Sequence, residues 1–157
     1  MKKIIIIVSI IIAIAILIPV LMHINIVLKE KYVDNIEYDI RVDYEYLGDN
    51  SGGAGYSIDY DLISIKDKKA YIIYEHYLYS NPHHYYRIKH KKISEDDIEK
   101  VLKYYDSLEE YDNSDLNTFA TSAGSDPYYR LVITYNDIKK STIIRYKDVG
   151  NYLPYKK

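Results

Sequence analysis

The chain contains no cysteine, no tryptophan and a single phenylalanine. Without cysteine, the protein has no disulfide, no thiol nucleophile, no Cys-based zinc site and no lipoprotein cleavage site. Tyrosine is abundant instead, with 21 residues that all follow the first 28 positions. Tyrosine is a typical side chain of binding surfaces. Biased coding that replaces other aromatic residues with tyrosine explains the same composition, and tyrosines would then serve in strands and core.

A large excess of one charge is also missing, since the net charge is −2. Two of the 21 Lys and Arg residues and none of the 23 acidic residues lie in the first 28 positions, so residues 29–157 carry a net charge of −4. Proteins that bind nucleic acid need a basic surface. The composition therefore excludes nucleic acid as an expected partner, and the 129 residues after position 28 suffice for one domain with a core.

The segment from Ile4 to Leu28 contains no charged side chain. As a helix it would be about 37 Å long, enough to cross a bilayer core of roughly 30 Å. A cleaved signal peptide has an apolar core of only about 7–15 residues followed by a small-x-small site. Here the Ala-x-Ala pattern of Ala13–Ala15 lies in the middle of the run. The sequence predicts an uncleaved, single-pass signal anchor over residues 1–28, with the lipid bilayer as the partner of residues 4–28.

The flanking charges predict the orientation of this anchor. Lys2 and Lys3 precede it, whereas Lys29 and Lys31 follow it with Glu30 between them. Cytoplasmic flanks carry the excess of positive charge. We therefore expect the N-terminus on the cytoplasmic side of the cell membrane and the C-terminal domain outside the cell.

Alternation of apolar and polar residues predicts β-strands in the part of the chain that follows the anchor, residues 29–157. A juxtamembrane linker is expected at 29–35, a domain at 36–147 and a tail at 148–157. The alternation is clearest from Ile36 to Tyr46 and is typical of a half-buried strand. In the next strand the apolar phase changes near Leu62 and Ile63, which predicts a β-bulge.

One amphipathic helix is predicted inside the domain. Ser94 is a suitable N-cap with Asp97 three residues later, and Ile93 and Ile98 form a hydrophobic staple. The apolar stripe ends near Glu110, so the helix is expected to end there. The expected fold class is α+β: an N-terminal transmembrane helix followed by an antiparallel sheet of five or six strands, with one helix packed on one face.

The order of these elements resembles that of small, uncharacterised bacterial envelope-anchored domains. The resemblance covers roughly residues 55–147 and rests on the capped helix of Ile93–Tyr111 and the hairpin of Tyr128–Tyr146. In those domains a capped amphipathic helix lies between two hairpins. The resemblance implies the fold and the envelope setting, and it assigns no catalytic residue.

No motif in the chain specifies catalysis or a cofactor. The glycines of 52–55 precede a strand rather than a helix, unlike a phosphate-binding loop. The segment Asp112–Asn117 resembles the start of a calcium loop but lacks the later Gly and acidic ligands, so an Asx-rich turn is the alternative. Four histidines are candidate metal ligands without zinc-site spacing, and a polar surface is the alternative for them: His76, His83, His84 and His90. The candidate binding surface consists of Tyr77, Tyr79, Tyr85 and Tyr86.

The expected function is that of a binding or interaction module at the cell envelope, with an envelope protein or the cell wall as partner. An anchored hydrolase is the alternative from another class, and a protective or immunity factor is a third. The absence of catalytic spacing favours the binding module and disfavours an enzyme.

Overall fold

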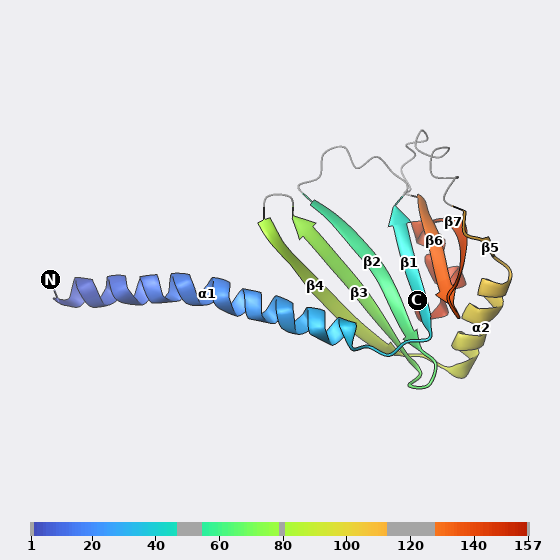
Figure 1. Cartoon of the computed structure of the whole chain (residues 1–157), viewed down its shortest axis with the longest axis horizontal. Coiled ribbons are helices and arrows are strands. Elements are labelled where there is room, and N and C mark those ends of the chain that lie inside the picture. Colours follow the sequence, from blue (N-terminus) through green and yellow to red (C-terminus); the bar gives the residue numbers. More distant parts are fainter. Residues whose placement is uncertain (1, 47–54, 79–80, 113–127, 157) are drawn as a thin grey trace.

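The chain folds into a long N-terminal helix and an antiparallel sheet that carries shorter helices on one face (Figure 1). This computed structural model describes residues 2–46, 55–78, 81–112 and 128–156. The long helix, α1, spans Lys2–Asp34 and projects away from the sheet. The α+β class predicted from the sequence is therefore confirmed.

The described residues form a single sheet of seven strands in the order β4-β3-β2-β1-β6-β7-β5. Every neighbouring pair is antiparallel. The strands are β1 (Ile40–Tyr46), β2 (Gly55–Ser64), β3 (Lys69–Leu78), β4 (Asn81–Lys92), β5 (Glu109–Glu110), β6 (Tyr128–Tyr135) and β7 (Ile138–Arg145). The expected count of five or six strands was too low, because the two-residue strand β5 has no alternation that a sequence pattern can detect.

The main core lies between one face of the sheet and the shorter helices. Ile40, Val42, Ile63, Leu131 and Ile133 are completely buried on this face. Helix α2 (Glu95–Asp106) covers them with a stripe of apolar side chains: Ile98, Val101 and Tyr105. Ser94 accepts a hydrogen bond from the Asp97 backbone N–H, and the Asp97 side chain accepts one from the Ser94 backbone N–H. The predicted N-cap is therefore confirmed, and with Asp97 it forms a capping box.

The opposite face of the sheet is also buried, over β2, β3 and β4. A second cluster there contains Tyr60, Leu62, Ile73 and Tyr86, and Val33 near the end of α1 packs against it. Tyr60 and Leu62 thus belong to one core and Ile63 to the other. The register of β2 with β1 and β3 is continuous through Leu62 and Ile63, so the predicted β-bulge is wrong. The change of phase reflects burial of both faces of the sheet.

The C-terminal residues do not form a tail. After β7 the chain makes a 3₁₀ turn (Tyr146–Asp148), a short helix α3 (Val149–Tyr152) and a second 3₁₀ turn (Pro154–Lys156). Val149, Leu153 and Tyr155 are buried in the main core. The boundary predicted at residue 147 is therefore wrong, and the domain extends at least to Lys156.

The segment expected to link anchor and domain is largely helical. Helix α1 continues to Asp34, and the Lys29 ammonium donates a 3.0 Å hydrogen bond to the backbone carbonyl of Tyr86 in β4. Together with the packing of Val33, this contact attaches the end of the helix to the sheet.

Candidate functional site

The most polar part of the core surrounds Asp61 in β2. Strand alternation places Asp61 between Val42 of β1 and Ile72 of β3, on the face that carries the main core. Its side chain is completely buried. A buried carboxylate is costly unless it is paired and hydrogen-bonded. The surrounding residues must therefore supply donors.

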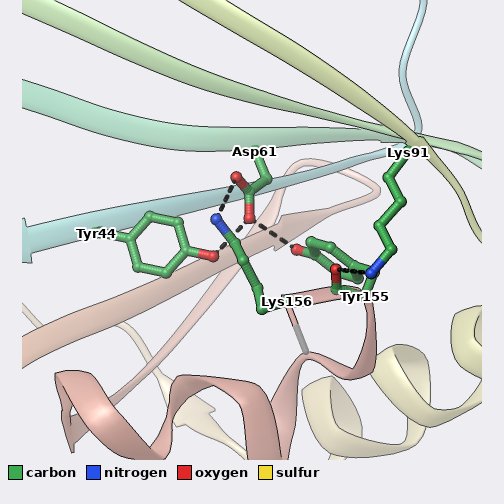
Figure 2. A network of polar contacts seen from close by, with 5 residues as sticks. All are labelled: Tyr44, Asp61, Lys91, Tyr155 and Lys156. Atoms are coloured by element: carbon green, nitrogen blue, oxygen red, sulfur yellow. Dashed lines mark hydrogen bonds and ion pairs between the residues drawn. The ribbon is translucent and has the colours of Figure 1, made fainter.

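Three donors from distant parts of the chain meet this carboxylate (Figure 2). The hydroxyl of Tyr44 donates to Oδ2 at 2.5 Å, and the hydroxyl of Tyr155 donates to the same oxygen at 2.9 Å. The Lys156 ammonium donates to Oδ1 at 2.8 Å. The Lys91 ammonium in turn donates to the backbone carbonyl of Tyr155 at 3.0 Å. These contacts fix the C-terminal segment to the sheet.

Burial controls the protonation of this group. It raises the pKa of the Asp61 carboxyl, and the adjacent Lys156 charge and the three hydrogen bonds counteract part of that shift. Burial also raises the pKa of the Tyr44 and Tyr155 hydroxyls well above the ordinary value, and the Asp61 charge raises them further. Both phenols therefore remain protonated at neutral pH and act as donors. The Lys156 ammonium also lies 4.7 Å from the centroid of the Tyr44 ring, in cation–π contact.

A cavity of about 340 Å³ lies next to this network. Strands β1, β2, β3 and β6 form its floor and the C-terminal segment forms a wall. Its lining combines carboxylates, ammonium groups, tyrosines and apolar side chains: Tyr44, Asp59, Asp61, Ile72, Ile73, Tyr74, Tyr129, Lys147, Val149, Gly150 and Lys156. A concave site with apolar walls and a few polar groups is typical of small-molecule binding.

The lining favours binding over acid–base catalysis at Asp61. A general base needs an oxygen within reach of the proton that it accepts. Both oxygens of Asp61 already accept hydrogen bonds from protein donors. The tyrosine rings and charged groups around the cavity can instead contact a small polar ligand through stacking, hydrogen bonds and ion pairs.

The four candidate histidines are distributed along β3 and β4. The register places His76 opposite Tyr85 and His84 opposite Tyr77, whereas the exposed His90 lies opposite Tyr71 farther along the strand. His83 also lies in β4; the side chains of His76, His83 and His84 are outside the described part of the structure. Among the side chains that are described, no group of three or more His, Asp or Glu residues is arranged to hold a metal ion.

The candidate tyrosine surface is only partly described. Tyr77 and Tyr85 lie in β3 and β4 without described side chains, and Tyr79 lies outside the described residues. Tyr86 is 7% exposed, and its hydroxyl donates to Glu75 Oε1 at 2.9 Å. Tyr86 is thus a residue of the second core and does not contribute an exposed ring to a surface. The glycines of 52–54 and residues 113–117 of the calcium-like segment are also outside the described residues.

The residues that form the site were not identified from the sequence. Asp61 looks like a solvent-facing member of an alternating strand, and Tyr155 and Lys156 lie in the expected tail. One usable signal was the phase change at Leu62 and Ile63, because it indicates that both faces of β2 are buried. Comparison of the chain with protein-family models, curated proteins and solved structures found no match.

Proposed function

We propose that the protein is a membrane-tethered binding module. In this proposal α1 spans the cell membrane, the domain lies outside, and the cavity beside Asp61 receives a small polar ligand of the envelope. The observation that carries the proposal is a long apolar helix that projects from a folded domain and is attached to it near its C-terminal end (Figure 1).

The exposure of α1 supports the tether. Within Ser9–Asp34 of this helix, an 18-residue window has a mean hydropathy of 2.7, and none of that window is buried. Ile16 and Leu17 are 63% and 54% exposed. Such a surface is unfavourable in water, whereas each central Ile or Leu stabilises insertion by roughly 0.3–0.6 kcal/mol. The basic residues Lys2 and Lys3 support an N-terminus inside and a domain outside.

The cavity supports binding as the activity of the domain. It lies on the core face of the sheet, where α3 and the 3₁₀ turns hold its wall in place. Both oxygens of Asp61 already accept hydrogen bonds from protein donors, which disfavours a hydrolase that uses this carboxylate. The tyrosines of the lining provide rigid contact area at low cost in conformational entropy.

Photo-crosslinking in intact cells tests this activity. A photoreactive residue at Ile72, inside the cavity, is expected to capture a discrete ligand that mass spectrometry detects as a defined mass increase. The control position is Ile58, which is 38% exposed and lies on the opposite face of β2. Gly150→Leu should fill part of the cavity and remove the adduct.

Adducts that are equal at Ile72 and Ile58, or that persist in Gly150→Leu, would contradict binding in the cavity. Chemical turnover of the captured ligand by the purified full-length protein would instead favour an anchored hydrolase.

A further inference from the structure

The edge strand β4 lies on the side of the domain from which α1 projects (Figure 1). Lys29, the first residue after the apolar run, donates its hydrogen bond to the Tyr86 carbonyl in the middle of β4. The polar headgroup layer of a bilayer begins where the hydrocarbon core ends. If α1 crosses the membrane up to Leu28, this hydrogen bond holds the middle of β4 at the level of the headgroups.

The sequence of β4 is basic. Residues 81–92 contain four Lys or Arg residues and no Asp or Glu. Lys91 is engaged with the Tyr155 carbonyl, but Arg87 and Lys89 are exposed and form no side-chain ion pair or hydrogen bond with other described residues.

Some exposed lysines of the domain are paired with acids, whereas others, Lys66 and Lys103 among them, form no ion pair with other described residues. Lys68 lies 2.5 Å from Glu95, and Lys100 pairs with Asp96 one turn away on α2. Surface pairs of this kind contribute little to stability, but they neutralise the local charge. Arg87 and Lys89 lack this local neutralisation, so their charges are available to another partner.

The basic β4 edge differs from the opposite edge of the sheet, where opposite charges meet. There the exposed Glu109 and Glu110 of β5 pair with β7, which contains Lys139, Lys140 and Arg145. Residues 29–157 as a whole carry a net charge of −4. The basic β4 edge is therefore contrary to the net charge of the domain, and it lies beside the anchor (Figure 1).

We propose that the β4 edge, through Arg87 and Lys89, docks on anionic lipid headgroups of the bilayer that α1 spans. This inference rests on the tether of the proposed function. Each basic residue near an anionic surface strengthens association by about fivefold, which corresponds to about 1 kcal/mol. The long aliphatic stems of Arg and Lys let their charges reach the headgroups from a strand above them. Docking would enrich anionic lipid around the protein and fix the orientation of the domain.

The test uses full-length protein reconstituted into vesicles of 70% phosphatidylcholine and 30% phosphatidylglycerol. Because the chain has no cysteine, a fluorophore on His90→Cys labels β4 alone. Energy transfer is measured to an acceptor on the acyl chain of either phosphatidylglycerol or phosphatidylcholine. We expect a preference for phosphatidylglycerol that falls about fivefold or more in R87Q/K89Q and weakens in 1 M salt, where the Debye length is about 3 Å.

The matched control is K66Q/K103Q, which removes the same charge from two exposed lysines on the β2–β3 turn and on α2. Its preference should equal that of the parent protein. No preference in the parent protein, or equal loss in both variants, would overturn the docking while leaving the tether intact. Energy transfer between protein copies that is independent of phosphatidylglycerol would assign the edge to a second copy and also overturn it. Release of the parent protein by a carbonate wash would contradict the tether itself, and with it the docking.

Discussion

Asp61→Ala is expected to lower the free energy of unfolding by about 3–5 kcal/mol, the cost of removing one partner of a buried ion pair. The substitution leaves Lys156, 18% exposed in its side chain, without its carboxylate. It also removes the acceptor of the Tyr44 and Tyr155 hydroxyls. Domains are stable by only about 5–15 kcal/mol, so this loss would leave the domain close to unfolding. Thermal unfolding of the full-length protein in detergent, followed by circular dichroism, measures the effect.

Asp43→Ala is the matched control for Asp61→Ala. Asp43 lies in the neighbouring strand β1 and pairs with Arg41 at 2.8 Å, but both side chains are partly exposed. Removal of such a pair costs about 0–1 kcal/mol. Asp61→Asn keeps one acceptor oxygen and the size of the side chain, and an intermediate loss is expected. Equal stability of Asp61→Ala and Asp43→Ala would contradict the role of the Asp61 network.

Leu153→Ala is expected to cost about 2–5 kcal/mol, as for other completely buried leucines. Leu153 is 0% exposed and lies in the main core with Val149 and Tyr155. The substitution leaves a cavity between the C-terminal segment and the sheet. The same unfolding measurement applies, and loss of the segment's packing should also make the chain more sensitive to proteolysis after β7.

Asn151→Ala is the control within the same segment, because Asn151 is exposed. Substitutions at such surface positions usually change stability by less than about 0.5 kcal/mol. Equal stability of Leu153→Ala and Asn151→Ala would contradict the packing of the C-terminal segment in the main core and would favour the tail that the sequence predicts at 148–157.

The elements with strong local patterns were predictable. The capping box at Ser94 is a contact between residues three apart, so the sequence contains both partners. The alternation in β1 correctly identified the buried face, with Ile40 and Val42 on it. The turn of the predicted hairpin of Tyr128–Tyr146 consists of Asn136 and Asp137 alone, both with positive φ, which Asn and Asp tolerate.

The elements that depend on contacts between distant residues were not predictable in the same way. Tyr155 and Asp61 are 94 residues apart in the sequence, and their hydrogen bond has no local signature. Prediction from alternation requires that one face of a strand be exposed to solvent, whereas both faces of β2 are buried. For this reason an ordinary strand was interpreted as a bulge. The short helix α3 has four residues, too few for an amphipathic pattern.

Cysteine accessibility in intact cells tests the central claim, a domain held outside the membrane by α1. The cysteine-free chain allows single labels at Lys66, in the exposed β2–β3 turn, and at Lys3, before the apolar run. With a membrane-impermeant maleimide, Lys66→Cys is expected to react in intact cells, and Lys3→Cys only after permeabilisation. Both proteins should remain in the membrane fraction after a carbonate wash. Protection of Lys66→Cys until permeabilisation, or recovery of the full-length chain in the soluble fraction, would contradict the account.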